Sequence, residues 1–415
     1  MSDGDGKKKQ VKEDNALPKL RFPEFKDVGE WDRKRMKDVA PLQRGFDLPT
    51  SQLQKGNIPV VYSNGIRNFH SIGMAKAPGL VTGRSGTIGQ FHFVEEGDYW
   101  PHNTSLWVTS FKGNLPKFIY YLYKSLRITR FESGSGVPTL NRNDVHSFKV
   151  GIPRSIEEQQ KIADCLSSID DRITAETQKL DTLKAHKKGL MQQLFPAEGE
   201  SVPKRRFRKF KKQWGETVLS KFINLQSGYA FKSEYFSEKG EKLLIPKNFT
   251  KTGYAHFSDE NTKYTTEEYD ARYVCRKGDL LLLLTDLTPS CELLGRPLLL
   301  TESDGNVLLN QRIARVIVKK EINLRFLLYL FSTASFRKRI INTATGSTVR
   351  HSSNKIVLST KIRIPEIPDE QQEVADCLSV LDEVIAAQTQ KLTKLKYHKK
   401  GLMQQLFPSL DEAKR

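Results

Sequence analysis

A segment of 40 residues that occurs twice constrains the fold of this chain more than any other feature. Residues 157–196 and 369–408 align without a gap, and 28 of the 40 positions are identical. Both copies end in GLMQQLFP, whereas the stretches that precede them are largely unlike. A gapless repeat of this length indicates one architectural element that is used twice, each time beside a different module. We therefore expect the two modules to differ in what they recognise.

The apolar residues of the repeat follow the heptad spacing of a coiled coil. Alternate steps of four and three residues meet ten positions in each copy, and eight of the ten are apolar. This spacing predicts two helices that pack along a seam, each of about forty residues and roughly 60 Å long. The predicted seam residues are Ile162, Leu166, Ile169, Ile173, Leu180, Leu183, Leu190 and Leu194 in the first copy and Val374, Leu378, Leu381, Ile385, Leu392, Leu395, Leu402 and Leu406 in the second.

Two polar layers interrupt the seam at matching positions of both copies. Glu176 corresponds to Gln388, and Lys187 corresponds to Lys399. These residues are either solvated boundary positions or polar layers that fix the register and an antiparallel orientation of the helices.

The ends of the repeated helices carry signals of their own. Ser155 followed by Glu158 predicts a capping box at the first start, and Pro196 and Pro408 stop both helices. An apolar ledge before each proline is wider than a two-helix seam requires, so we expect it to dock a partner protein. The ledge residues are Leu190, Met191, Leu194 and Phe195, repeated as Leu402, Met403, Leu406 and Phe407.

The two modules share an α+β pattern of short strands and few helices. Turns rich in Gly, Asn and Pro separate short runs that are typical of strands. The two modules also share weak sequence similarity. QRGF at 43–46 resembles QSGY at 226–229. PKLRF at 18–22 resembles PKRRF at 203–207, and a Trp follows each of these at 31 and 214. The predicted strands are 58–62, 91–94, 106–109, 280–285 and 313–318, and the predicted helices are 115–131 and 324–341.

The charge of the chain indicates an anionic partner. A net charge of +19 with a pI near 9.6 would destabilise the fold by self-repulsion unless such a partner were usually bound, and nucleic acid is the commonest one. The alternative is a basic soluble protein without such a partner. Four cysteines without a C-x-x-C pair favour neither a disulfide scaffold nor a zinc site. No apolar run predicts a signal peptide or a membrane span, so we expect a cytoplasmic protein.

The repeats and the modules together resemble the specificity subunit of type I restriction-modification enzymes. The resemblance rests on EQQ-x-x-ADCLS and QKL-x-x-LK-x-HKKGLMQQLFP in both repeats, and on the Ile-Pro pair at 152 and 364. Weaker markers lie in the modules: GRSGTIG at 83–89, WPHNTSLW at 100–107, GDLL from 278, NQRIAR at 310–315 and ATGSTV at 344–349.

The resemblance implies two α/β target recognition domains, joined and separated by two long antiparallel coiled-coil helices in a pseudo-two-fold arrangement. Each domain would read one half of a bipartite, asymmetric DNA target, and the chain would position two modification (methyltransferase) subunits and the restriction (translocase/endonuclease) subunits. S-adenosylmethionine, ATP and magnesium would bind to those partner subunits, and no cofactor would bind to this chain. The expected segments are a disordered tail at 1–16, domain 1 at 17–153, spacer 1 at 154–196, domain 2 with a basic linker at 197–365, spacer 2 at 366–408 and a tail at 409–415.

Arg and Lys read guanine edges, and Asn and Gln read adenine edges, so polar residues in turns are the candidates for DNA contact. Each candidate could instead satisfy backbone groups within its own turn. Arg142 and Arg350 could hold phosphate, and so could the basic run at 204–212 and the group 337–339. The predicted DNA-binding residues are Tyr62, Ser63, Asn64, Arg67, Arg84, Ser85, Thr87, His102, Asn103, Arg142, Lys204, Arg205, Arg206, Arg208, Lys247, Asn248, Thr285, Asp286, Asn310, Gln311, Arg312 and Arg350.

Motifs of catalysis are absent from the sequence. It contains no P-loop, no N-P-P-[YF] or D-P-P-[YF] methyltransferase signature and no H-E-x-x-H metal motif. We therefore expect a subunit that is not itself an enzyme. The resemblance implies that it is part of a phage-defence system. Two alternatives stay open: a self-sufficient DNA methyltransferase or nuclease with unrecognised catalytic residues, and a basic coiled-coil scaffold.

Overall fold

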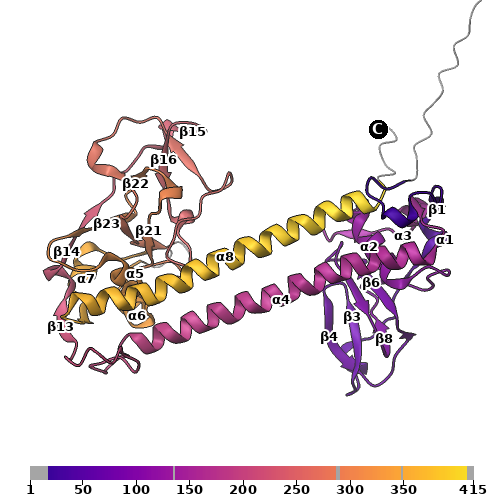
Figure 1. Cartoon of the computed structure of the whole chain (residues 1–415), viewed down its shortest axis with the longest axis horizontal. Helices are drawn as coiled ribbons and strands as arrows, with labels where there is room; N and C mark the ends of the chain where they lie inside the picture. The colour runs from indigo at the N-terminus through magenta and orange to yellow at the C-terminus, as the bar shows by residue number, and fades with distance from the viewer. Residues whose placement is uncertain (1–16, 134–135, 287–289, 347–348, 409–415) are drawn as a thin grey trace, which may run out of the picture. The chain divides into compact units, whose positions relative to one another are not determined.

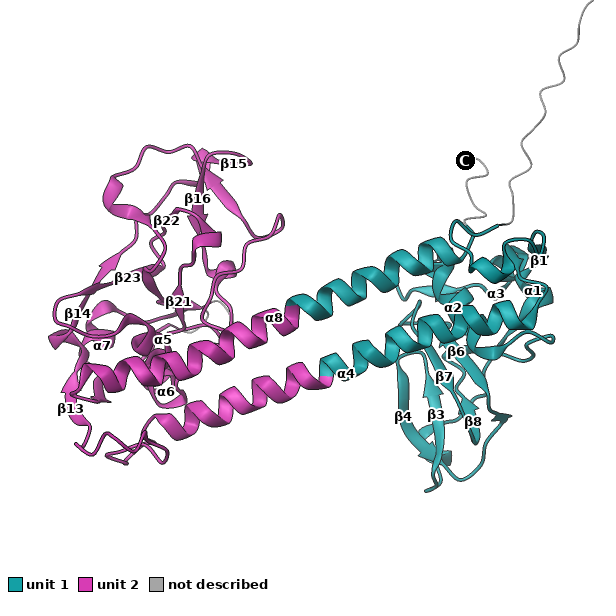
Figure 2. Cartoon of the chain, in the orientation of Figure 1, with its two compact units in different colours: residues 1–177, 390–415 teal, residues 178–389 magenta. Residues whose placement is uncertain are grey.

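The computed structural model of the chain describes residues 17–133, 136–286, 290–346 and 349–408 (Figure 1). These residues form two compact units: unit 1 contains the described residues within 1–177 and 390–415, and unit 2 contains those within 178–389 (Figure 2). Two long helices, α4 (Ile156–Leu194) and α8 (Pro368–Leu406), each contribute residues to both units. The predicted tails at 1–16 and 409–415 lie outside the described residues.

The first long helix begins at the predicted cap, but only half of the capping box forms. The Glu158 backbone N–H donates to Ser155 Oγ at 3.2 Å, as a Ser N-cap should. The Glu158 carboxylate does not return to the cap, because it accepts hydrogen bonds from Arg21 and Trp31 instead. The capping-box prediction is therefore wrong for the Glu158 side chain.

Within unit 1 the two long helices run antiparallel. Asp170 of α4 pairs with Lys399 of α8, and Glu176, further along α4, pairs with Lys391, earlier on α8. None of the sixteen predicted seam residues is exposed, and Leu166 and Leu378 are fully buried. The heptad pattern therefore identified the inward faces of both helices.

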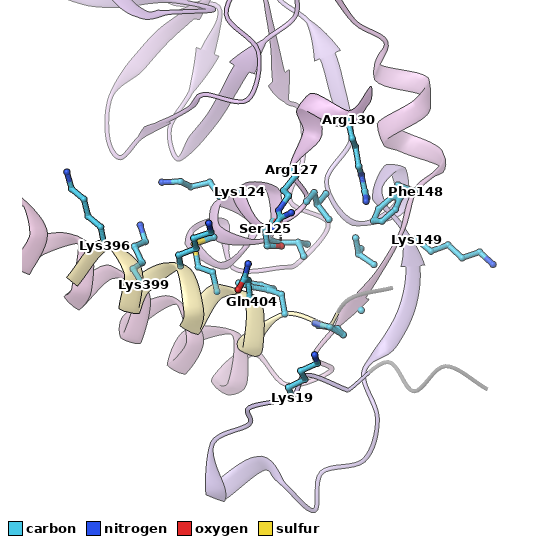
Figure 3. Close-up of a pocket in the computed structure, with 18 residues that line it drawn as sticks. Lys19, Lys124, Ser125, Arg127, Arg130, Phe148, Lys149, Lys396, Lys399 and Gln404 are labelled. Atoms are coloured by element: carbon cyan, nitrogen blue, oxygen red, sulfur yellow. Dashed lines mark hydrogen bonds between the residues drawn. The ribbon is translucent and has the colours of Figure 1, made fainter. Parts of the chain in front are cut away.

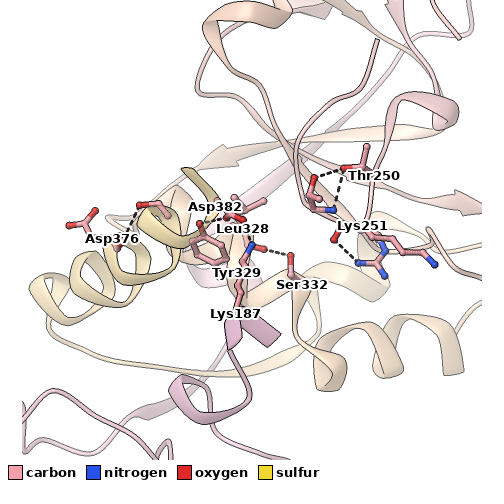
Figure 4. Close-up of polar contacts among 11 residues, drawn as sticks. Lys187, Thr250, Lys251, Leu328, Tyr329, Ser332, Asp376 and Asp382 are labelled. Atoms are coloured by element: carbon pink, nitrogen blue, oxygen red, sulfur yellow. Dashed lines mark hydrogen bonds and ion pairs between the residues drawn. The ribbon is translucent and has the colours of Figure 1, made fainter. Parts of the chain in front are cut away.

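The lysines that interrupt the seam form ion pairs with buried or half-buried aspartates. In unit 2, Lys187 pairs with Asp382 of α8, which also accepts a hydrogen bond of 2.7 Å from the Tyr329 hydroxyl (Figure 4). In unit 1, Lys399 pairs with Asp170 of α4, which accepts a hydrogen bond of 2.9 Å from Tyr121. The alternative of solvated boundary residues is therefore wrong for both lysines. These polar layers tie each long helix to its neighbour and to a helix of the adjacent module.

We expect Tyr329→Phe to lower the free energy of unfolding by about 1–3 kcal/mol, because the substitution removes a donor from a buried carboxylate. The Asp382 side chain is 9% exposed, so water cannot readily replace the lost hydroxyl. Tyr121→Phe is the matched control, since Asp170 is 33% exposed and can be hydrated. Denaturant unfolding followed by circular dichroism measures both variants. If both variants lost the same free energy of unfolding, the burial of Asp382 would not explain the effect of Tyr329→Phe.

The module of unit 1 consists of two four-stranded sheets and a helix that covers one of them. Helix α2 (Pro116–Ser125) packs against β6 and β7. The first sheet has the order β2-β9-β6-β7 (Leu42–Arg44, Ser105–Val108, Gly79–Gly83, Phe91–Val94), and the second has the order β4-β3-β8-β5 (Gly65–His70, Ile58–Tyr62, Asp98–Pro101, Ala75–Lys76). The remaining elements are β1 (Asp32–Arg35) with β12 (Lys149–Ile152), β10 (Glu132–Ser133) with β11 (Thr139–Leu140), α1 (Met36–Val39) and α3 (Arg142–Ser147).

The module of unit 2 repeats this plan with different sequence. Its first sheet has the order β14-β23-β19-β21 (Ile223–Ser227, Ile313–Val318, Leu280–Leu283, Pro297–Leu299). Its second has the order β15-β17-β16-β22-β18 (Phe236–Ser237, Lys263–Thr265, Glu241–Leu244, Val307–Leu309, Val274–Cys275). The remaining elements are β13 (Gly215–Val218) with β25 (Lys361–Ile364), β20 (Thr285–Asp286) with β24 (Arg350–His351), α5 (Leu324–Ser332), α6 (Ala334–Asn342) and α7 (Asn354–Leu358).

Both predicted module helices are shorter than expected. The stretch 324–341 forms two helices, because the Thr333 Oγ1 accepts from the Phe336 backbone N–H and caps the start of α6. The stretch 115–131 ends as an α-helix at Ser125, and a short 3-10 helix, η3 (Ile128–Phe131), follows it. Arg127 between them has a left-handed backbone with φ of 47°, which an α-helix cannot continue through.

The predicted docking ledge is instead part of the chain's own core. Phe407, which follows the end of α8, packs against Phe118 of α2 with ring centroids 5.6 Å apart. Phe195 packs in the same way against Phe326 of α5 at 5.4 Å and against Trp214 at 6.2 Å. The partner-docking prediction for this ledge is therefore wrong, since each module already covers it.

The four cysteines are free thiols, and Cys275 and Cys291 are buried. Across the part of the chain that is described, no helix has the length and apolar character needed to cross a membrane.

Candidate nucleic-acid interface

In unit 1, two parallel strands bring two predicted turns to one edge of a sheet. Strand β3 pairs in parallel with β8, with Val61 opposite Pro101, so the residues that follow both strands emerge together. The His102 backbone N–H donates to the Val61 carbonyl at 3.0 Å. The imidazole of His102 stacks on the ring of Tyr62 with centroids 4.1 Å apart. The turns 62–64 and 102–104 therefore form one surface.

A third turn, 84–87, completes this surface. The Arg84 backbone N–H donates to the Thr104 carbonyl at 2.8 Å, and the Arg84 carbonyl accepts from Leu140 at 2.8 Å. The Arg84 guanidinium also donates to the Asn103 carbonyl at 3.3 Å. We call these three turns reading site 1; of the predicted residues they bring together Tyr62, Ser63, Asn64, Arg84, Ser85, Thr87, His102 and Asn103. Arg67 is exposed on β4, and Arg142 is exposed at the start of α3.

Electrostatic contacts hold reading site 1 in a defined protonation state. Asn103 donates its side-chain amide to Asp47, and Arg44 pairs with the same carboxylate at 2.7 Å. The Asn103 hydrogen bond is the main reason that the pKa of Asp47 is lowered. Burial lowers the pKa of His102, so its imidazole is neutral at pH 7. A neutral imidazole offers one donor and one acceptor to a ligand.

Unit 2 builds a second surface on the same plan, which we call reading site 2. Strand β16 pairs in parallel with β22, with Leu244 opposite Leu309, so the turns 245–248 and 310–312 leave at a common edge. The Leu284 backbone N–H donates to the Arg312 carbonyl at 3.0 Å, which adds the turn after β19. Lys247 and Gln311 are exposed there, whereas Asn310 and Arg312 are half-buried.

The two reading sites share one backbone frame. Phe46 donates to the Pro101 carbonyl at 2.8 Å, and Tyr229 donates to the Leu309 carbonyl at 2.9 Å. The Arg84 bond to Thr104 corresponds to the Leu284 bond to Arg312. On this frame residues 102–104 (His-Asn-Thr) correspond to 310–312 (Asn-Gln-Arg). Equivalent positions therefore carry different donors and acceptors, as two sites that read different base edges require.

A glycine makes each frame possible. A Cβ on Gly45 would lie 2.2 Å from the His102 carbonyl oxygen, and one on Gly228 would lie 2.1 Å from that of Asn310. Only a residue without a side chain allows this approach. The similarity between QRGF and QSGY therefore has a structural reason: both motifs need a glycine where the backbone approaches a carbonyl oxygen.

Four predicted DNA-binding residues are buried, which corrects the prediction for each. Asn248 is fully buried; its side-chain oxygen accepts from Ile245, and its amide donates to the carbonyls of His256 and Asn261. Asp286 is 4% exposed and accepts from the backbone of residues 293 and 294. Thr285 is 5% exposed beside His351, and Ser63 is 9% exposed beside the Gly83 turn. The side chains of Asn248, Thr285 and Asp286 form hydrogen bonds with groups of the protein itself.

Two predicted arginines also have structural partners. Arg206 makes a two-pronged ion pair with the buried Glu370. Arg350 donates to the carbonyls of Ile341 and Ala344 at the end of α6. Both guanidinium groups thus serve the fold and not a phosphate group. The same correction applies to Arg337, which donates to the carbonyls of residues 291 and 292.

The other predicted residues of the basic run stay available to a ligand. Lys204, Arg205 and Arg208 are exposed, and Lys204 lies 4.0 Å from Glu200. Lys209 pairs with Glu373, and Lys212 pairs with Glu366. No local pattern predicts that acidic residues near the start of α8 would pair with this run. In the described part of the chain, no group of three or more His, Cys, Asp or Glu residues could hold a metal ion.

Sequence reasoning missed three residues of the reading sites. Thr104 occupies the position that Arg312 has in the other site, and Phe46 and Tyr229 pair with the turns through bridges to His102 and Asn310. The aligned QRGF and QSGY motifs end on these two aromatic residues, so their alignment could have identified Phe46 and Tyr229.

Comparisons with known proteins agree with this architecture. The family model described as "Type I restriction modification DNA specificity domain" matches residues 29–185 and 211–397. A curated relative, the type I restriction enzyme MjaVIII specificity subunit of Methanocaldococcus jannaschii, is 28% identical over 69% of both chains. A putative type I specificity subunit of Mycoplasma pneumoniae is 25% identical over 36% of this chain and 40% of its own length.

Solved structures show the same fold. The crystal structure of a type I restriction-modification S subunit from M. genitalium superposes with a TM-score of 0.62 and 16% identity, and covers 95% of this chain and 100% of that one. A chain from a structural study of the assembly and conformational transition of the type I R-M system gives a TM-score of 0.53 and 13% identity, over 90% and 96%. Since the family model matches twice and spans most of the sequence, the chain belongs to the type I restriction-modification DNA specificity family.

Proposed function

We propose that this chain is a specificity subunit that reads a bipartite, asymmetric DNA target, one half with each reading site. One observation carries the proposal: the two reading sites have the same backbone hydrogen bonds but different side chains. The same hydrogen bonds fix both sets of turns, yet His-Asn-Thr in one site corresponds to Asn-Gln-Arg in the other. Such a pair of sites fits two different half-targets, because base identity is read by the pattern of donors and acceptors.

The proposal assigns the chemistry to other subunits. We propose that the chain positions two modification (methyltransferase) subunits and the restriction (translocase/endonuclease) subunits, which bind S-adenosylmethionine, ATP and magnesium. The specificity subunits named among its relatives and the assembled type I system among its structural neighbours support this arrangement. The net charge of +19 supports contact with a DNA duplex.

The test is to map methylated bases in DNA treated with the chain and its modification subunits. We expect Arg312→Ala to relax one half of the target and Asn64→Ala to relax the other, each by about 1–3 kcal/mol of discrimination at a base pair. Lys221→Ala, an exposed position away from both sites, is the control and should leave the target unchanged. Equal methylation of all sequences by the unmodified chain, or the same half relaxed by both variants, would refute the proposal.

A self-sufficient methyltransferase or nuclease is the second candidate. It predicts turnover when the purified chain alone is incubated with DNA, magnesium and S-adenosylmethionine. The basic scaffold predicts an unchanged target in both variants above. Neither candidate explains why two sites should share a frame and differ in their side chains.

A further inference from the structure

An open groove of about 650 Å³ lies beside the last turns of α8 in unit 1 (Figure 3). Its floor consists of apolar residues, among them Leu122, Met403 and Phe407. Its walls come from three parts of the unit: the C-terminal turns of α8, the segment from α2 to η3, and strand β12. No reading-site residue lines it, so the groove is a separate feature.

The groove is strongly basic. Lys396, Lys399 and Lys400 line it from α8, and Lys399 also pairs with Asp170. In Figure 3, Lys396 and Lys399 rise from α8 on the side that faces Lys124 and Arg127. The cations that line the groove are Lys19, Lys124, Arg127, Arg130 and Lys149 in addition to the three lysines of α8. Among the described residues, no carboxylate lines it.

The equivalent groove of unit 2 has a different charge. Phe195 there corresponds to Phe407, and Lys361 corresponds to Lys149. This groove has about 240 Å³ and is lined by three carboxylates, Glu198, Glu200 and Glu216. Glu216 pairs with Arg363 at 2.9 Å and Glu198 pairs with Lys338 at 2.9 Å. Carboxylates thus line the groove of unit 2. In unit 1, Asp170 pairs with Lys399, but no carboxylate is among the described residues that line the groove.

The groove of unit 1 connects to reading site 1 through η3. Thr129 of η3 lies against the turn that ends at Gly89, where an added Cβ would meet the Thr129 methyl at 2.8 Å. Arg127 and Arg130 flank Thr129 and line the groove. The short helix that carries Arg130 thus contacts the end of the loop that contains the 84–87 turn. Arg127, just before this helix, has a left-handed backbone, which an Arg adopts at some cost.

We propose that this groove binds the phosphodiester backbone of DNA, in continuity with reading site 1. The inference rests on the proposed function and adds a site that gives affinity without sequence choice. Lysine is depleted in protein–protein interfaces, whereas protein–DNA interfaces are strongly positive, so eight cations favour phosphate over an acidic protein segment. Each phosphate that the groove neutralises releases counterions and makes binding depend on salt.

The experiment measures the full chain binding to a fluorescent duplex of random sequence over a series of salt concentrations. The groove variant carries Arg127→Gln, Lys396→Gln and Lys400→Gln, since Gln keeps the helix propensity of Lys in α8. The matched control carries Lys179→Gln, Lys184→Gln and Lys394→Gln, which remove the same charge at exposed positions of α4 and α8 outside the groove. We expect the slope of log K against log salt to fall by about one per contacting residue in the groove variant only. Circular dichroism verifies that both variants are folded.

Two outcomes would overturn the assignment: an unchanged slope in the groove variant, or an equal fall in the control. If the slope is unchanged and capture of the modification subunits is weaker, the occupant is an acidic protein segment. The random duplex also separates this inference from the proposed function. A chain that fails to direct methylation to one sequence can still show the slope change, and a chain that directs methylation can lack it.

Discussion

Glu370→Ala should lower the free energy of unfolding by about 3–5 kcal/mol, the largest stability effect that we expect from a single polar side chain. Glu370 is 1% exposed and accepts from Arg206 at 2.6 and 2.7 Å and from the Trp214 indole N–H at 2.9 Å. Its carboxylate raises the pKa of Arg206 through the hydrogen bond. Removal of the carboxylate leaves the half-buried Arg206 without its ion pair, and it leaves the buried Trp214 N–H without an acceptor. Each loss is costly.

The control for this substitution lies one turn further along α8. Glu373 pairs with Lys209, but its side chain is 32% exposed and that of Lys209 is 62% exposed. Exposed ion pairs contribute about 0–1 kcal/mol, so Glu373→Ala should have little effect. Denaturant unfolding followed by tryptophan fluorescence compares the two variants. If Glu370→Ala costs no more than Glu373→Ala, the buried pair does not anchor the module.

Unit 1 contains the same anchor. Arg21 donates twice to Glu158, at 2.7 and 2.8 Å, and the Trp31 indole N–H donates at 3.0 Å. We therefore expect Glu158→Ala to have an effect of the same size as Glu370→Ala. The weak echo of PKLRF with PKRRF, each followed by a Trp, is the sequence signature of these anchors.

The long helices were the most predictable part of the fold. A heptad pattern is local and repeats many times, so it determines which face of α4 and α8 is apolar without knowledge of the rest of the chain. All sixteen seam residues are indeed buried or half-buried. The strands at 58–62, 91–94 and 313–318 were also predicted with their observed bounds.

Contacts between distant segments were not predictable from local pattern. Glu158 fits a capping box by its spacing from Ser155, yet its partner Trp31 lies 127 residues away. The ledge at Phe195 looked unpartnered because Trp214 and Phe326 meet it only in the folded unit. Asn248 and Asp286 have the residue types of a DNA contact, but their side chains turn inward to backbone groups. The residue type predicts which hydrogen bonds a side chain can form. The direction in which the side chain points depends on the tertiary fold.

Gly228→Ala should abolish recognition of the half-target read by unit 2 and should destabilise the unit by about 1–3 kcal/mol. The new Cβ would lie 2.1 Å from the Asn310 carbonyl oxygen and 2.6 Å from that of Leu309. Both obstacles are backbone, so the strand and the turn must separate. Separation breaks the 2.9 Å hydrogen bonds from Tyr229 to Leu309 and from Gln311 to Tyr229. Gln311 and Arg312 would then lose the frame that holds them in reading site 2.

Two matched glycines make this prediction specific. Gly45→Ala places the same clash in unit 1, 2.2 Å from the His102 carbonyl, and should abolish recognition of the other half-target only. Gly189→Ala lies in α4 with nothing within 4 Å of the new Cβ, and should stabilise the chain by up to about 1 kcal/mol. Methylation mapping with the modification subunits reports on recognition, and unfolding reports on stability. If Gly228→Ala and Gly45→Ala altered the same bases, the two frames would not act as separate readers. If both left the target intact, the close approach of glycine to the turn would not be what orients the reading residues.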